Sequence, residues 1–101
     1  MRTHPQGDTL LVNEFTDLGA SNAGMLRDLV RATLKPEHRY VAIDLSNSTF
    51  VDSEGLGALV GIHKAVVVRG GAVRLVNCSP MIRDLFRLTR LEGLFEFPSG
   101  S

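Results

Sequence analysis

The chain has only one cysteine, no tryptophan and no excess of charge of either sign. A lone thiol cannot form an internal disulfide, which suits a reducing compartment, and we expect Cys78 to be a small buried hydrophobe at the end of a strand. The 11 Lys and Arg residues balance the 11 Asp and Glu residues. The sequence therefore lacks the basic excess expected of a protein that binds nucleic acid directly.

Long apolar runs are missing as well. No run approaches the roughly 20 residues needed to cross a bilayer, and Met1–Gln6 lacks the apolar core of a signal peptide. An apolar content of 44% over 101 residues predicts one globular domain, residues 1–101, with a modest core. We expect a cytoplasmic protein without membrane insertion, frayed at residues 1–8 and 98–101.

The first half of the chain predicts a strand followed by an amphipathic helix. A turn at Gly7 precedes a strand over residues 9–15, and the residues before this turn could add a short edge strand. Ser21 or Asn22 is suited to cap the helix, which Pro36 stops. The apolar face of this helix comprises Leu26, Leu29, Val30, Thr33 and Leu34.

A second strand and a second helix are expected in the middle of the chain. Residues 40–45 are apolar at nearly every position, so we expect this strand to be buried on both faces. The following helix starts at Ser53 and runs to about Arg69, with Gly70 as its left-handed end. A hairpin around Gly70 and Gly71 is the alternative for this segment.

A third helix is predicted to begin after Ser79, which has the oxygen of an N-cap and is followed by Pro80. Residues 94–97 then form a last strand or a packing segment. The apolar face of the helix is expected to consist of Met81, Ile82, Leu85 and Phe86.

The histidines do not support enzyme chemistry or a metal site. A serine nucleophile needs a base within hydrogen-bond reach, and His4, His38 and His63 are scattered along the chain. No pair of His or Cys residues has the spacing of metal ligands, so we expect solvated histidines. The sequence predicts no enzyme, no metal and no cofactor.

Ser53 is the most informative single residue. It precedes Gly55 and Gly57 instead of lying within a Gly-x-Ser-x-Gly elbow, and the glycines lack the lysine of a phosphate-binding loop. At a strand-to-helix turn, unpaired N–H groups and the helix dipole would accommodate a phosphate on this hydroxyl. Two interpretations remain open: an N-cap with Asp52 and Glu54 complementing the dipole, or a regulatory phosphorylation site.

Residues 41–59, Val-Ala-Ile-Asp-Leu-Ser-Asn-Ser-Thr-Phe-Val-Asp-Ser-Glu-Gly-Leu-Gly-Ala-Leu, closely resemble the signature of STAS domains of the anti-sigma factor antagonist type. The resemblance continues through residues 69–76, 79–86 and 91–95. It implies an α/β fold: a mixed, mostly parallel β-sheet of four to five strands with helices packed against it. It also favours a helix followed by a strand around Gly70.

The resemblance implies a phosphorylation-switched binding protein that regulates transcription indirectly. Ser53 would accept phosphate from a histidine-kinase-like, ATP-dependent anti-sigma factor, and a metal-dependent serine phosphatase would remove it. The unmodified form would sequester the anti-sigma factor, docking through the start of the helix around Asp52, Ser53, Glu54 and Gly55. Asp52 would help the kinase place the serine or its metal. Weak self-association is also compatible with this family.

Two positions depart from the family pattern. Glu54 replaces the usual Ser or Thr and puts a permanent charge beside Ser53. Many antagonists carry an aspartate where this chain has Gly19, and Asp17 is the nearest substitute. The alternatives are an unphosphorylated accessory or regulatory subunit of a lipid or anion transporter, with Ser53 as an interface cap, and a ligand sensor, which requires a cavity.

Overall fold

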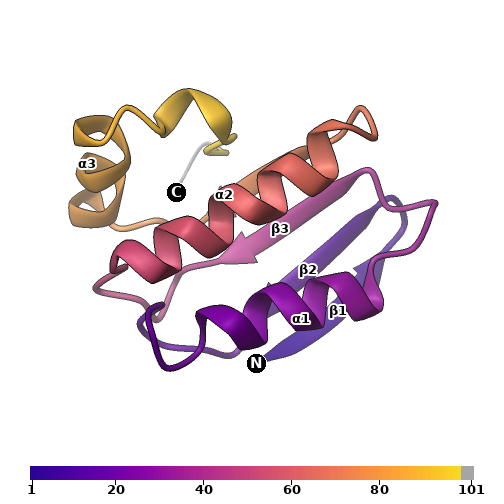
Figure 1. The fold of residues 1–101 in the computed structure, drawn as a ribbon, viewed down its shortest axis with the longest axis horizontal. Coiled ribbons are helices and arrows are strands. Elements are labelled where there is room, and N and C mark those ends of the chain that lie inside the picture. Colours follow the sequence, from indigo (N-terminus) through magenta and orange to yellow (C-terminus); the bar gives the residue numbers. More distant parts are fainter. Residues whose placement is uncertain (99–101) are drawn as a thin grey trace.

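A four-stranded mixed sheet forms the centre of the computed structural model, which describes residues 1–98 (Figure 1). The strand order is β1-β2-β3-β4; β1 is antiparallel to β2, and the other neighbours are parallel. This confirms the predicted α/β architecture. The elements are β1 (Arg2–Gln6), β2 (Thr9–Asn13), α1 (Ala23–Thr33), β3 (Tyr40–Asp44), α2 (Ser53–Val67), β4 (Ala72–Val76), α3 (Pro80–Leu88) and the 3-10 turn η1 (Glu92–Leu94).

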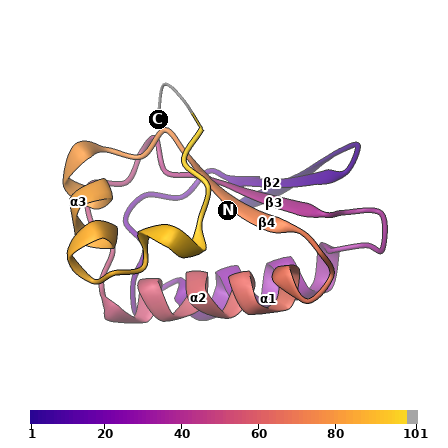
Figure 2. The ribbon, with the colours of Figure 1, turned by 90° about the horizontal axis from the view of Figure 1, so that it is seen from above.

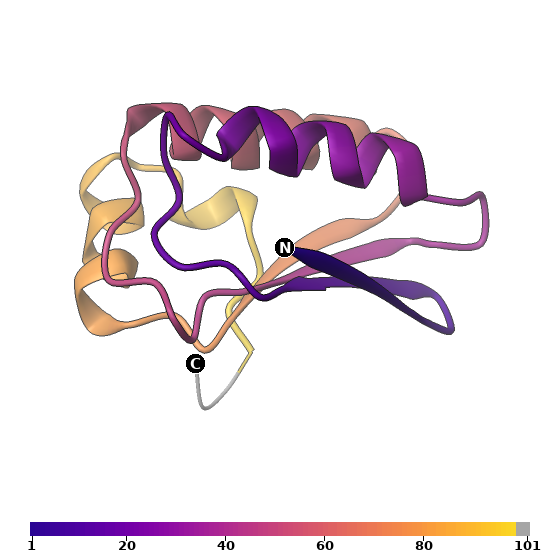
Figure 3. The same ribbon diagram turned by 90° about the horizontal axis from the view of Figure 1, so that it is seen from below.

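Helices α1 and α2 lie side by side on one face of the sheet, and α3 lies beyond one end of it (Figures 2 and 3). The chain steps from β2 to β3 to β4 in one direction, so right-handed crossovers place both helices on the same side. The prediction that β3 is buried on both faces is therefore wrong at its ends. Ala42 is buried, whereas Tyr40 and Asp44 are only half-buried on the face without helices.

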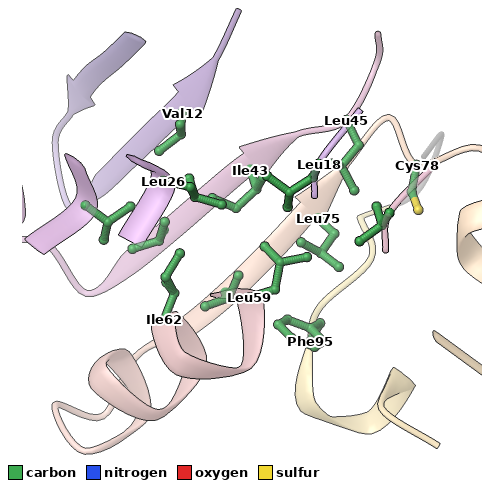
Figure 4. Close-up of a cluster of buried hydrophobic side chains, with 14 of the residues drawn as sticks. Val12, Leu18, Leu26, Ile43, Leu45, Leu59, Ile62, Leu75, Cys78 and Phe95 are labelled. Carbon is green, nitrogen blue, oxygen red and sulfur yellow. The ribbon is translucent and has the colours of Figure 1, made fainter. Parts of the chain in front are cut away.

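The core fills the layer between the sheet and the two helices (Figure 4). Leu26 and Val30 of α1 are buried there, as their spacing predicts, and each such side chain contributes about 1.5–3 kcal/mol. Cys78 is 6% exposed after β4, again as predicted. Burial raises the pKa of its thiol, which keeps it in the unreactive neutral form.

The N-terminal residues form the short edge strand that the sequence left open, so the expectation that residues 1–8 fray is wrong over β1. The strand pairs with β2 from Arg2 opposite Asn13 to Gln6 opposite Thr9. Gly7, with φ +63°, makes the tight turn that brings the two strands together. The other expected frayed segment, 98–101, falls mostly on residues 99–101, which lie outside the described residues.

The helix-then-strand interpretation around Gly70 is correct, because Gly70 ends α2 with φ +77° and β4 follows. The segment after α3 forms a packing segment rather than a full fifth strand. Glu96 exchanges backbone hydrogen bonds with β4, accepting from Leu75 N–H at 2.8 Å and donating to the carbonyl of Val73 at 2.9 Å.

Two side chains differ from expectation. His38 is 2% exposed rather than solvated, because its Nδ1 accepts the Lys35 N–H at 3.0 Å and closes the turn after α1. Met81 is 71% exposed rather than part of the apolar face of α3. This two-turn helix buries a narrow stripe through Ile82 and Phe86, and Met81 lies about 100° away around the axis.

The loops that follow β2 (residues 14–22) and β3 (residues 45–52) are joined along their length, and we call them the paired loops. Ser48 donates its hydroxyl hydrogen bond to the carbonyl of Thr16. Leu18 N–H donates to the carbonyl of Phe50 at 3.1 Å, and Asp52 N–H donates to the carbonyl of Leu18 at 3.0 Å. These bonds continue the β2–β3 pairing beyond the sheet and fix the start of α2.

Asp17 fastens the paired loops at their middle. Its Oδ1 accepts from Thr49 N–H at 2.8 Å, Thr49 Oγ1 at 3.1 Å and Phe50 N–H at 3.1 Å. These bonds, the Thr49 backbone amide first, hold the pKa of the Asp17 carboxyl below its ordinary value. The ionised side chain therefore acts as a fastener between two loops.

Gly55 provides the first test of this arrangement. A Cβ at Gly55 would lie 2.6 Å from the carbonyl oxygen of Leu18, whereas one at Gly57 would meet nothing within 4 Å. We expect Gly55→Ala to lower the free energy of unfolding by about 1–3 kcal/mol through overpacking. Gly57→Ala, the matched control, should raise it slightly through helix propensity. Urea denaturation checks both, and equal effects of the two substitutions would contradict the close contact.

Asp17 gives the second test. Because its pKa is lowered by folding, its stabilisation is present above the unfolded-state pKa of about 4 and is lost as the pH falls through the folded-state value. We expect Asp17→Asn to be less stable than the parent chain at pH 7. The gap between their unfolding free energies should shrink by about pH 3. Urea titrations at both pH values measure it, and an unchanged gap would contradict the role of the charge.

Candidate functional site

The start of α2 is capped by Asp52. Its Oδ1 accepts the Gly55 N–H at 2.9 Å, and its carbonyl accepts the Leu56 N–H at 2.9 Å. Ser53 is thus the first residue of the helix, and the interpretation of Ser53 as the N-cap is wrong. A carboxylate here satisfies an unpaired amide and complements the helix dipole, so Asp52 takes the capping position and leaves the serine side chain free.

The second oxygen of Asp52 holds the neighbouring loop. Its Oδ2 accepts the Ala20 N–H at 3.1 Å. The bond from Gly55 N–H, helped by those from Ala20 and Glu54, holds the pKa of the Asp52 carboxyl below its ordinary value. A Cβ at Gly19 would lie only 2.4 Å from Asp52 Oδ2. The glycine at position 19, where the family pattern has an aspartate, therefore makes room for the Asp52 carboxylate.

Ser53 and Glu54 both extend toward solvent at this capped end. Within residues 1–98, no hydrogen bond to another protein group engages the Ser53 hydroxyl, so it is accessible to a modifying enzyme. Glu54 adds a negative charge in the first turn of α2, where the helix dipole favours it. Asp52 and Glu54 therefore flank the hydroxyl with two carboxylates on adjacent residues.

Asp17 does not join this group. Its carboxylate is bound to Thr49 and Phe50, three to four residues before Ser53, and it supports the loop that leads to the site. Sequence reasoning placed Asp17 as a substitute for the aspartate missing at position 19. The structure brings together the start of α2 and both loops, but it gives Asp17 a fastening position instead of a place beside the serine.

An apolar groove of about 290 Å³ adjoins the site, between the β3–α2 loop and α3. Phe50, Met81 and Leu88 are 56%, 71% and 79% exposed in it, although solvent-exposed large hydrophobics usually avoid gathering in one place. Sequence reasoning missed this surface. The available signal was Phe50, a large apolar residue within an otherwise polar loop, together with the distance of Met81 from the buried stripe of α3.

Within residues 1–98, no three His, Cys, Asp or Glu side chains gather closely enough to hold a metal ion. Over the same residues, no helix has the length and apolar content needed to span a membrane.

Curated relatives match most of this chain. A STAS-domain containing protein of Pseudomonas aeruginosa is 31% identical over 88 residues, which cover 87% of this chain and 84% of that protein. The anti-sigma-B factor antagonist of Bacillus subtilis is 30% identical over 90 residues, covering 89% of this chain and 82% of that protein.

Solved structures share the fold. A candidate anti-sigma factor antagonist from Thermotoga maritima superposes with a TM-score of 0.85 at 23% identity, covering 95% of this chain and 83% of that one. The Bacillus cell fate determinant SpoIIAA in its phosphorylated form gives a TM-score of 0.74 at 18% identity, covering 98% and 91%. The murine anion transporter Slc26a9 gives 0.71 at 20%, covering 84% of this chain and 14% of that one.

The family assignment agrees with the sequence signature and with the geometry at the start of α2. The model of the STAS domain family matches residues 2–99, nearly the whole chain. Two curated relatives reach 30% identity or more while covering over four fifths of this chain. The chain therefore belongs to the STAS domain family.

Proposed function

We propose that this protein is an anti-sigma factor antagonist whose binding is switched by phosphorylation of Ser53. The observation that carries the proposal is an exposed serine at the first position of α2, directly after a firmly held aspartate cap. A Bacillus subtilis relative bears the name of an anti-sigma factor antagonist, and a structure with the same fold is described as a phosphorylated form. Both support this function for the present chain.

The physical basis of the switch is the charge that phosphorylation adds. Phosphoserine brings about −1.5 to −2 charges to a helix end that favours anions through its dipole and free amides. The paired loops and the Asp52 cap hold this end in place, so the domain keeps its shape. The cost falls on the partner, which would have to bury a dianion flanked by Asp52 and Glu54. A penalty of a few kcal/mol lowers affinity by two or more decades.

The proposed partners are a histidine-kinase-like anti-sigma factor that phosphorylates serine, and a serine phosphatase that reverses the reaction. In this scheme the domain is a substrate without catalysis of its own. Asp52 acts by fixing the backbone that presents Ser53, since both of its oxygens already accept backbone amides. Glu54 makes the docking surface acidic even before phosphorylation.

The alternative is an accessory or regulatory subunit of a lipid or anion transporter, in which Ser53 stays unmodified. Slc26a9 supports only a common fold at 20% identity, and this chain covers 14% of it. Curated relatives from Bacillus subtilis and Paenibacillus polymyxa carry the names of anti-sigma factor antagonists instead. We therefore favour the phosphorylation switch.

The acceptor can be tested directly by mass spectrometry. After incubation with the cognate anti-sigma factor kinase and ATP, we expect the intact chain to gain the mass of one phosphate. Ser53→Ala should gain none, whereas the matched control Ser46→Ala, at an exposed loop serine, should gain the same mass as the parent chain. Phosphate on Ser53→Ala would overturn the acceptor, and an unmodified parent chain would overturn the proposed function.

The apolar groove supplies a second test, because we propose that the unphosphorylated domain docks its kinase through Ser53 and this surface together. We expect Phe50→Ala and Leu88→Ala each to weaken kinase binding about tenfold, as loss of a buried apolar anchor does. Val68→Ala, at an 82% exposed residue at the other end of α2, is the matched control and should not change it. Calorimetric titration measures the affinities, and equal effects at all three positions would contradict the docking surface.

A further inference from the structure

Helices α1 and α2 lie side by side (Figure 1). Side chains of both helices line a second depression, in the halves of the helices that are remote from Ser53. It has a volume of about 340 Å³. Its floor is apolar, and arginines from α1 and from the turn after α2 line it; we call it the arginine groove. Its floor consists of Val30, Leu34, Ile62 and Ala65, and its arginines are Arg27, Arg31 and Arg69.

The three arginines of this groove have no ion-pair partner among the described residues, although Asp28 lies beside Arg27 in α1. Over residues 1–98, no carboxylate lines the groove. Arg27 and Arg31 are four residues apart on α1, a spacing at which like charges destabilise a helix. Elsewhere on the molecule, four arginines pair with carboxylates: Arg2 with Glu14, Arg74 with Glu96, Arg83 with Glu92 and Arg87 with Asp84. Within residues 1–98, Arg39 and Arg90 also form no ion pair, but they do not line the groove.

Arg69 is held in position across the gap between the helices. Its guanidinium donates to the carbonyl of Lys35, just beyond α1, at 2.6 Å. This bond fixes a side chain from the turn after α2 next to the end of α1. A guanidinium has five N–H donors, so one backbone contact leaves most of them available to an anion.

Gly61 keeps the floor of the groove open. It lies in the middle of α2, where glycine costs about 1 kcal/mol relative to alanine. A Cβ at this position would meet only Arg27 Cδ, at the ordinary distance of 3.8 Å. The packing of the described residues therefore does not require a glycine here, and its effect is to leave space in front of the arginines.

We propose that the arginine groove binds a small amphiphilic anion, with an apolar body and a carboxylate or phosphate head group. The head group would accept hydrogen bonds from the arginine side chains, and the body would lie on the apolar floor beside Gly61. The groove is at the lower end of the 300–1,000 Å³ typical of small-molecule sites. This proposal is independent of the phosphorylation of Ser53.

Octyl phosphate is a suitable probe, added below its micelle concentration to the full chain and followed by amide NMR shifts. We expect saturable shifts centred on Gly61 and Ala65. Inorganic phosphate supplies only the anionic head group and octanol only the apolar body, so each should bind at least tenfold more weakly than octyl phosphate. If either compound bound as tightly as octyl phosphate, the proposal that the ligand is amphiphilic would be overturned. Shifts centred on the apolar groove at Phe50 would overturn the location.

Substitutions test separately the contributions of the arginine charges and of the open space at Gly61 to binding. The double variant Arg27→Gln/Arg31→Gln should weaken octyl phosphate binding at least tenfold, and Gly61→Leu, which fills the groove and favours the helix, should abolish it. Arg87→Gln and Gly57→Leu are the matched controls outside the groove and should leave it unchanged.

A membrane is the competing source of such an anion. We expect no co-sedimentation with phosphatidylglycerol vesicles when the lipid concentration equals the octyl phosphate concentration that saturates the groove. Binding to vesicles without binding to octyl phosphate would overturn the small-ligand proposal in favour of a membrane surface. Retained octyl phosphate binding in the double arginine variant would overturn the assigned head-group site.

Discussion

The two hydrogen bonds of the Asp52 carboxylate determine how Ser53 is presented. One oxygen accepts the Gly55 amide and starts α2, and the other accepts the Ala20 amide in the loop before α1. Capping a helix needs only one oxygen, so the second is available to tie the helix sideways to a segment more than thirty residues away in the chain. The backbone of Ser53, which follows, is therefore held both along the helix axis and across it. Within residues 1–98, the Ser53 hydroxyl itself takes no part in these hydrogen bonds.

The space for this arrangement comes from two glycines. A side chain on Gly19 would occupy the place of the Asp52 carboxylate, and one on Gly55 would press on the carbonyl of Leu18. The absence of a side chain at position 19 is thus coupled to the conformation of Asp52. A carboxylate at position 19 would have to share this space with a second negative charge, a combination that like-charge repulsion disfavours.

Periodicity, caps and turns predicted most elements, including the end of α2 at Gly70 and the start of α3 after Ser79, because these signals act over a few residues. The features that the sequence did not predict depend on which backbone group a side chain meets once the chain is folded. The burial of His38 follows from the Lys35 amide that its ring nitrogen accepts, and the edge strand that the sequence left open forms because β1 pairs with β2. In the site, the motif located Ser53, but the position of Asp17 depends on Thr49, thirty-two residues away, which no local pattern encodes.

The zero net charge conceals a polar arrangement along α2. Asp52 and Glu54 lie at its start, and Arg69 lies two residues beyond its end, which is the order that the helix dipole favours. The other two arginines of the groove, Arg27 and Arg31, belong to α1. Gly61, the groove residue of α2 nearest to Ser53 in the chain, lies eight residues further along the helix, about 12 Å, which exceeds the Debye length of about 8 Å at physiological salt. Charge at one end is therefore screened from the other. A phosphate on Ser53 and an anion in the arginine groove can be accommodated independently, and any coupling between them would have to pass through the packing of α1 against α2.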